Sequence, residues 1–566
     1  MSTIKRVYVY TVFTITLGMF ATGGQILLRL FFDIIKGQTL IEIGAPGFNR
    51  QQLSLGLALL LIGGILWFFF WRAIQRQVTA NPDELGTAIR KLFLNLILVV
   101  TAFVSLYTAA GFLQWLLAGI TREQFSPGGL ATLIVAISIW YYYRRVSERE
   151  GQPSPAARTL RRWYVYLLSG WGLVSLSVGL VQLINQSILF LPVWGNAIAY
   201  GGFWNSSVHS NLGWTLLGGA AWGFHWFHMA RGDSDSTLRH VYLYLLAIPG
   251  GAIAVLVPLT TSLFSVFTFA LGGFGVASDR YFLFLGWTVP TMLVAAAIWT
   301  YHQKVVQEEA EQRPERQSSE QRVLRYIMSF IGLGTLVTGL IVLLGILLEL
   351  LTNAISRGPI AVTLGWWHQQ LSLCLALLLV ALPIWLYYWN RVLQMVAGND
   401  VAERTARSRR IFLYMVMGVA IIILAADLVN IIYQLLNGLL KGTFGAEIFS
   451  GSKWSLQSLV IAIPVLWYHW RVLRHDQRLR VEKGQLRKTV TILAGEPAQD
   501  LVSLIEEKLG SHTRRLRYLG QTLEDIPVLS DEEADKLVSD IRAVLGNKVL
   551  VVVAGGKVMV LPYKEK

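Results

Sequence analysis

The chain has 566 residues and a formal net charge of +15, with 54% hydrophobic residues. Charged residues make up 15%, against about 25% in a typical soluble domain. This composition excludes a disordered chain and an ordinary soluble enzyme, the single Cys374 excludes a disulfide scaffold, and together they indicate a polytopic membrane protein.

The first element is an apolar stretch that follows residues 1–6 directly, without a small-residue cleavage site. We therefore expect a first transmembrane helix and not a signal peptide. A similar start, with one or two basic residues followed by aromatic or apolar ones, recurs at intervals of 71 to 86 residues. The basic residues of these six starts are Lys5, Arg90, Arg161, Arg239, Arg325 and Arg409.

Each start opens an apolar run of about 25 residues, long enough to cross a 30 Å hydrocarbon layer. A second apolar run follows and ends in a cluster of Trp, Tyr, Phe or His. The pattern predicts six two-helix hairpins, hence about 12 transmembrane helices in an all-α membrane protein. The predicted hairpins one to six occupy residues 1–88, 89–159, 160–237, 238–322, 323–407 and 408–483.

The distribution of Lys and Arg predicts the orientation. Up to residue 480, 28 lie at the N-terminus, between the hairpins or after the last helix, and 8 lie within the hairpins. By the positive-inside rule, both termini are expected in the cytoplasm. The aromatic clusters then meet an anionic inner leaflet. Four tryptophans are predicted to be interfacial anchors there: Trp71, Trp226, Trp389 and Trp470.

Residues 484–566 have the pattern of a small cytoplasmic α/β domain with the order βαβαββ. Ser530 with Glu533 three residues later is a capping box for the second helix, and Gly555-Gly556-Lys557 is a hairpin signal. The expected strands are residues 489–493, 514–519, 549–553 and 558–561, and the expected helices are residues 497–509 and 530–545.

Ionisable residues inside apolar helices are functional candidates. Asp427 and Asn430 lie on one face of the first helix of hairpin six. One interpretation is a proton- or cation-coupling site. The other, which we favour, is a hydrogen bond between helices.

A second candidate is a polar column at the outer end of the first helix of each hairpin. The column would form a ring at an outer vestibule if the hairpins surround an axis, but polar helix ends at the lipid interface are the simpler interpretation. An i,i+4 pair between Arg29 and Asp33 is expected. The column contains Arg29, Gln114, Asn185, Leu263, Glu349 and Tyr433.

The histidines do not predict a ligand site. His225, His302 and His469 share a repeat position with Phe and Tyr, which indicates packing. The sequence has no hydrolase, zinc-protease, dinucleotide or phosphate-loop motif, so we expect no enzyme activity, catalytic residue, cofactor or metal. The positive charge is a topology signal, and no nucleic-acid partner is expected.

The recurring basic start and the Trp-rich finish resemble those of a bacterial membrane-protein family called domain of unknown function 5671. The resemblance covers residues 4–475 as repeated copies, with departures at Gln303, Tyr326 and Met328. It implies a multi-pass protein of the bacterial cytoplasmic membrane, and it brings no established activity.

Two functions from different classes remain. The first is a membrane scaffold or sensor whose domain 484–566 binds a cytoplasmic protein partner. The alternative is a transporter or channel-like protein with a polar outer vestibule.

Overall fold

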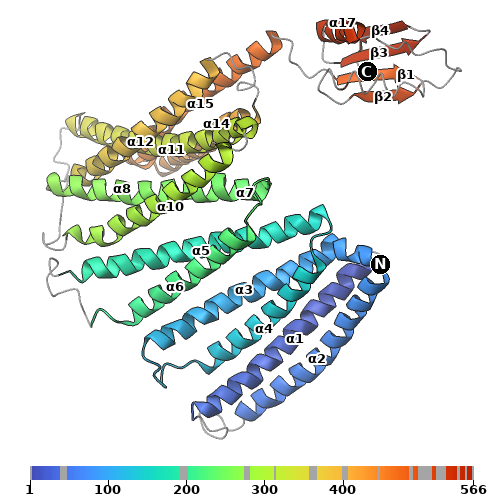
Figure 1. Ribbon diagram of the computed structural model, residues 1–566. Coiled ribbons are helices and arrows are strands. Elements are labelled where there is room, and N and C mark those ends of the chain that lie inside the picture. Colours follow the sequence, from blue (N-terminus) through green and yellow to red (C-terminus); the bar gives the residue numbers. More distant parts are fainter. Residues whose placement is uncertain are drawn as a thin grey trace. The chain divides into compact units, whose positions relative to one another are not determined.

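The computed structural model describes residues 3–37, 48–191, 202–272, 281–311, 314–355, 366–397, 406–442, 446–482, 489–494, 506, 513–517, 531–544, 548–554 and 557–563. The chain divides into two compact units, Met1–Val392 and Leu393–Lys566. Long helices make up the first unit, and the second contains two long helices and a small sheet (Figure 1).

The helices of the first unit form five successive antiparallel pairs, as the repeat predicts (Figure 1). Short helical segments connect or extend them: η1 (Pro82–Gly86), the π-helices η3 (Phe224–Met229) and η4 (Tyr242–Ala247), α7 (Thr237–Val241), and η5 (Phe282–Phe284). The pairs are α1 (Thr3–Ile35) with α2 (Phe48–Ala80), α3 (Ala88–Leu117) with α4 (Pro127–Glu150), α5 (Pro155–Leu189) with α6 (Ser206–Gly223), α8 (Ile248–Ala270) with α10 (Leu285–Glu311), and α11 (Pro314–Ile355) with α12 (Trp366–Ala397).

Glycine allows the two helices of the odd-numbered hairpins to approach closely. A Cβ atom added at Gly23 of α1 would lie 2.4 Å from the backbone nitrogen of Leu60 in α2. A Cβ atom at Gly172 of α5 would lie 2.5 Å from the nitrogen of Trp222 in α6. Such distances leave no room for a side chain, so the backbones pack directly against each other.

Successive hairpins of the first unit stack in sequence order. The first helix of one hairpin packs against the second helix of the next: α1 against α4, α3 against α6, and α5 against α10. Buried aromatic residues from several hairpins, including Tyr10, Tyr143 and Tyr242, form one hydrophobic cluster. The hairpins therefore make nearest-neighbour contacts, as in a repeat protein.

The second unit contains a sixth helix pair, α14 (Arg407–Lys441) with α15 (Ala446–Glu482). Its sheet has the strand order β2-β1-β3-β4, with β2 and β3 parallel to β1 and β4 antiparallel to β3. The elements are β1 (Thr489–Ala494), β2 (Arg514–Arg517), α17 (Asp531–Ala543), β3 (Lys548–Ala554) and β4 (Lys557–Pro562).

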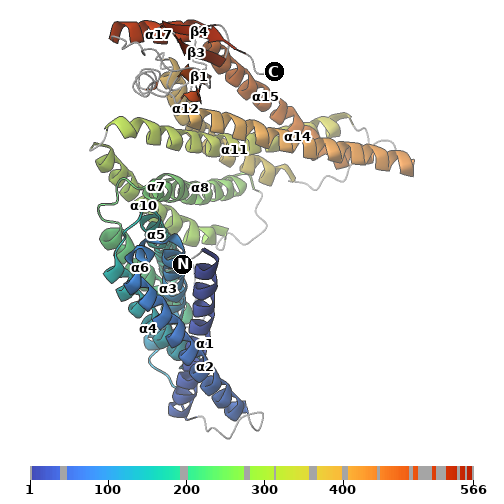
Figure 2. The same ribbon diagram turned by 90° about the vertical axis from the view of Figure 1, so that its right-hand side faces the viewer.

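This sheet confirms the four predicted strands. Ala554 pairs with Lys557, which is the register of the predicted tight hairpin. Helix α17 covers one face of the sheet (Figure 2), where Leu537 and Ile541 pack on the strand valines. The predicted helix 497–509 lies outside the described residues except for Glu506.

Ten helices among the described residues are long and apolar enough to cross a membrane. The sequence predicts about 12 spans, and ten helices meet these criteria of length and composition; α4 and α6 are not among them. Helix α4 ends in the charged sequence of residues 144–150, and α6 has only 18 residues before it continues as a π-helix.

Candidate functional site

In hairpins one and three, an ion pair joins the start of the first helix to the segment that follows the second helix. In hairpin one, Arg6 at the start of α1 donates to Glu84 in η1 from Nε at 3.0 Å and from Nη2 at 2.7 Å. In hairpin three, Arg162 of α5 donates to Asp233 from Nε at 2.9 Å and from Nη2 at 2.6 Å. Both acidic residues lie in the connector that follows the second helix.

The even hairpins also have an ion pair between their two helices, but residues at other positions form it. Their arginine is the predicted repeat residue itself, and their acidic partner belongs to the second helix. We call these ion pairs and the two above the clasps. The even clasps join Arg90 to Glu150, Arg239 to Glu309 (Nε to Oε1, 2.8 Å) and Arg409 to Asp476 (Nε to Oδ2, 2.6 Å).

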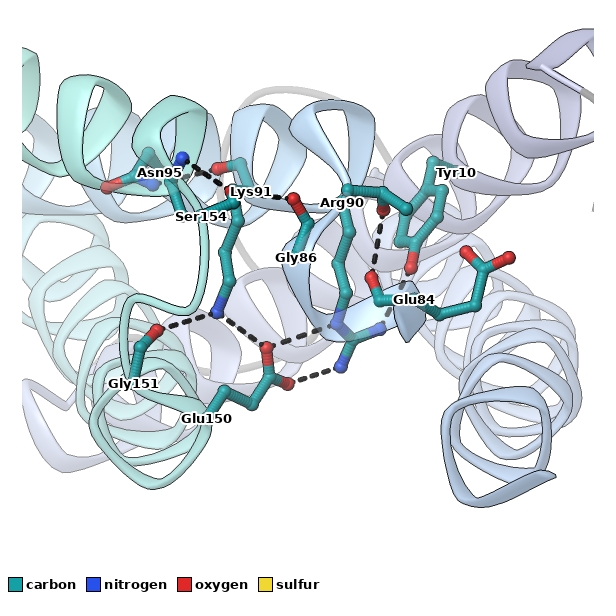
Figure 3. Close-up of polar contacts among 11 residues, drawn as sticks. Tyr10, Glu84, Gly86, Arg90, Lys91, Asn95, Glu150, Gly151 and Ser154 are labelled. Carbon is teal, nitrogen blue, oxygen red and sulfur yellow. Dashed lines mark hydrogen bonds and ion pairs between the residues drawn. The ribbon is translucent and has the colours of Figure 1, made fainter. Parts of the chain in front are cut away.

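The clasp of hairpin two belongs to a buried charged cluster (Figure 3). The side chains of Arg90 and Lys91 are fully buried. Arg90 donates to Glu150 from Nε at 3.1 Å and to the hydroxyl of Tyr10 at 2.8 Å. Lys91 donates to Glu150 and to the carbonyl of Gly151, both at 3.0 Å. Two cations thus share one carboxylate, which leaves one positive charge in excess.

Tyr10 joins hairpin one to this cluster. The Ser154 hydroxyl donates to the carbonyl of Gly86 at 2.7 Å, which joins the two neighbouring connectors, and Asn95 donates to the carbonyl of Lys91 one turn earlier on α3 at 2.8 Å (Figure 3). The equivalent Tyr166 in hairpin three donates to Asp233 at 3.0 Å. Tyrosine therefore occupies the same position beside the clasps of two odd hairpins.

The clasp of hairpin one lowers the pKa of Glu84, which lies in the connector after α2. The Arg6 guanidinium, through its hydrogen bonds, lowers the pKa of Glu84, although burial of the carboxyl acts in the opposite direction. Glu84 is therefore ionised over a wider pH range than an ordinary glutamate.

Three of the four predicted interfacial tryptophans are buried in protein, so their assignment as anchors at a lipid surface is wrong. Trp71 is 7% exposed, Trp226 is 4% exposed and Trp389 is 3% exposed. The guanidinium carbon of Arg90 lies 5.7 Å from the ring of Trp71, and that of Arg239 lies 4.5 Å from the ring of Trp226. Only the fourth, Trp470, is exposed (47%). Trp71 and Trp226 therefore pack one hairpin against the next.

Asp427 and Asn430 face the partner helix α15. The hydroxyl of Ser458 donates to the buried carboxylate of Asp427. Asn430 donates to the hydroxyl of Ser455 at 2.9 Å and to the carbonyl of Gly451 at 3.2 Å. These contacts agree with the favoured interpretation, a hydrogen-bonded helix pair.

The residues of the predicted polar column stay on separate helices of the stack. Arg29 forms the expected pair with Asp33 on α1, at 3.6 Å. Gln114 lies near the end of α3, and Asn185 contacts Gln182 of its own helix α5 at 3.5 Å. Glu349 is partly buried on α11. Because the hairpins of the first unit stack in a row, the column does not become a ring there.

The buried histidines of the shared repeat position form local hydrogen bonds. Nδ1 of His225 lies 2.7 Å from the carbonyl of Ala221, and its Nε2 lies 3.2 Å from the hydroxyl of Tyr164. Nδ1 of His469 lies 2.8 Å from the carbonyl of Val465. The part of the chain that the structure describes contains no cluster of three or more His, Cys, Asp or Glu residues that could hold a metal ion.

The repeat in the sequence predicts the arginine of each even clasp, but it predicts neither Arg6 and Arg162 of the odd clasps nor any acidic partner. The two residues of a clasp are 60 to 78 positions apart. The available signal was an acidic residue at or just after the end of each second helix, but several candidates lie in each connector.

The comparison with curated proteins found no match, and the comparison with solved structures found none either. The family model for Domain of unknown function (DUF5671) matches residues 6–129, 162–293 and 322–451. Each match begins in an odd hairpin and extends into the second helix of the following even hairpin, so the family unit has the same two-hairpin period as the clasps. These matches cover more than half of the chain, and the protein belongs to the DUF5671 family.

Proposed function

We propose that this protein is a multi-pass protein of the bacterial cytoplasmic membrane that serves as a scaffold or sensor, with both termini in the cytoplasm and no catalytic activity of its own. Ten long apolar helices support membrane insertion, because a helix of about 20 apolar residues spans a bilayer. The excess of basic residues between the hairpins supports the orientation.

The observation that favours a scaffold over a transporter is that the buried charged side chains have partners within the protein. Among the described residues, the buried charged side chains other than Asp427 belong to a clasp or, like Lys91, bind a clasp carboxylate. A transport pathway needs polar groups that face a shared cavity and change partners. Here Asp427 is bound to Ser458, and the polar column is spread along a stack of helices.

The C-terminal domain supplies the surface for a cytoplasmic protein partner in this proposal. Its sheet and α17 share a core of their own, formed by Val490, Ile492, Leu537, Ile541, Val549 and Val551. A small domain with its own core suits a module that recruits another protein.

Thiol labelling tests insertion and orientation. In a Cys374→Ala background, Asp83→Cys reports on the connector after hairpin one, and Ser206→Cys reports on the opposite end of hairpin three. An impermeant maleimide should label only the Ser206→Cys protein in intact cells and both proteins after lysis. Labelling of the Asp83→Cys protein in intact cells would contradict the orientation.

Deletion of residues 484–566 tests the scaffold. We expect partners that cross-link to the full chain in membranes to be lost, while membrane insertion is retained. Retention of the same partners by the shortened chain would refute this role for the domain. Ion or solute flux through vesicles that contain the Asp427→Asn protein should equal wild-type flux, and a change would favour transport.

A further inference from the structure

A polar cavity of about 220 Å³ lies where hairpins two and three meet. Helices α3, α4 and α5 and the connector between α4 and α5 supply its polar residues. We propose that this cavity binds the headgroup of an anionic phospholipid that carries a hydroxyl group, such as phosphatidylglycerol. The argument uses five of its lining residues: Asn95, Arg144, Glu148, Gln152 and Arg161.

The charges around the cavity favour an anion. Nε of Arg144 donates to Glu148 at 2.8 Å, so these two charges compensate each other. The exposed Arg161 has no ion pair among the described residues. Guanidinium groups bind phosphate oxygens through paired hydrogen bonds, which makes Arg161 the main phosphate ligand in this proposal.

The buried cluster behind the cavity adds to this field. Arg90, Lys91 and Glu150 together carry one excess positive charge, and Lys91 donates to the carbonyl of Gly151, which lines the cavity. A buried excess charge is stabilised by an anion nearby. The cavity and the cluster together therefore carry two uncompensated positive charges.

The side chain of Gln152 indicates that the ligand carries a hydroxyl group. Its Oε1 atom is buried and has no hydrogen-bond partner. An unsatisfied buried acceptor is unfavourable, and a phosphodiester cannot satisfy it because a phosphodiester only accepts. A hydroxyl on the headgroup can donate to Oε1 while the phosphate binds Arg161.

The next junction between an even and an odd hairpin lacks one of these groups. In hairpin four, Gln303 occupies the repeat position of Arg144, so the equivalent cavity would lack one guanidinium. The assignment of the ligand to a lipid rests on the proposed membrane insertion, which places this end of the hairpins at the inner leaflet.

Lipid retention by the full chain provides the test. The protein is transferred from nanodiscs of phosphatidylcholine with phosphatidylglycerol into detergent, and native mass spectrometry then counts the retained phosphatidylglycerol. We expect one retained lipid in the wild type and a loss of roughly tenfold in retention for Arg161→Gln, which removes a charged hydrogen-bond donor. Arg145→Gln, an exposed arginine outside the cavity, is the matched control and should retain the lipid.

A second variant tests the hydroxyl. Wild type should prefer phosphatidylglycerol to phosphatidylmethanol, which has the same charge but no hydroxyl, and Gln152→Leu should remove this preference while anionic lipid is still retained. Equal retention by wild type and Arg161→Gln would overturn the proposal, as would loss in Arg145→Gln. Displacement of the lipid by millimolar inorganic phosphate would identify a site for soluble phosphate instead.

The outcome is separable from that of the proposed function. Thiol labelling of the Asp83→Cys and Ser206→Cys proteins reports on insertion and orientation without any dependence on the cavity. If the thiol labelling shows the expected orientation but Arg161→Gln retains the lipid as wild type does, the lipid site is refuted and the proposed membrane topology is not.

Discussion

At the scale of single residues, the main feature is a buried carboxylate that serves two cations. Glu150 accepts hydrogen bonds from Arg90 and Lys91, whose side chains are inaccessible to solvent. Removal of one member of a buried charged group leaves the others without compensation. The stability of this junction therefore depends on Glu150 more than on any exposed ion pair.

Glu150→Gln should lower the free energy of unfolding by about 3–5 kcal/mol, because two buried cations lose their carboxylate. Glu148→Gln is the control, since that side chain is 49% exposed in its pair with Arg144, and its effect should stay below about 1 kcal/mol. Denaturant unfolding in detergent measures both. Equal effects would show that the buried cluster contributes no more than an exposed pair.

The clasp between Arg6 and Glu84 makes stability depend on pH. The pKa of Glu84 is lowered in the folded protein, so its contribution is fully present above the ordinary glutamate pKa of about 4.3. It is lost as the pH falls through the lowered pKa. Glu84→Gln should therefore lower the melting temperature at pH 7, and the difference from wild type should disappear in acid.

Thermal unfolding from pH 7 to pH 3 checks this dependence. Glu123→Gln changes an exposed carboxylate that forms no clasp and should follow the wild-type curve. A constant difference between Glu84→Gln and wild type across the whole range would exclude the ionised clasp as its cause.

At the scale of the elements, glycine determines how closely the helices of an odd hairpin pack. Gly23 and Gly18 lie on the same helix α1, but only Gly23 contacts the backbone of α2. At Gly18, an added Cβ atom would find no heavy atom within 4 Å. The two positions therefore separate close packing from helix propensity.

Gly23→Ala should destabilise the protein by about 1–3 kcal/mol, because the added methyl group forces α1 and α2 apart. Gly18→Ala should be neutral or slightly stabilising, since alanine favours a helix. Thermal unfolding of the two variants under the same conditions measures the difference. If both variants behave alike, the close approach at Gly23 does not limit packing.

At the scale of the molecule, the first unit is a stack in which each hairpin packs on the next. Stability in such an arrangement is a sum of terms from each repeat and from its interfaces with its neighbours. A local perturbation should therefore stay local. This distinguishes a stack from a bundle that surrounds one common core.

Hydrogen exchange in the full chain measures this locality. In the Gly23→Ala protein, amides of α1, α2 and α4 should exchange faster, because these helices contact each other. Amides of α8 and α10 should exchange at the wild-type rate. Faster exchange throughout residues 3–311 would show that the hairpins unfold as one cooperative unit.

The sequence by itself determined the helical hairpins and the strands of the C-terminal domain. Apolar runs, their basic starts and the alternation in residues 489–493 are local patterns, and local patterns determine secondary structure. The sequence also favoured a hydrogen bond between helices for Asp427, and this agrees with the hydrogen bond that Ser458 donates to it. The π-helices η3 and η4 were not predicted, because their extra residue per turn depends on packing.

Only the tertiary structure decided which charges meet. Arg6 pairs with Glu84 in an odd hairpin, and Arg90 pairs with Glu150 in an even one. The repeating unit of the ion pairs is therefore two hairpins, whereas the sequence pattern repeats with every hairpin. Tertiary packing also buried Trp71, which the sequence had placed at a lipid surface. The physical reason is that these contacts join residues 60 or more positions apart, and their pairing depends on where helix ends lie in space.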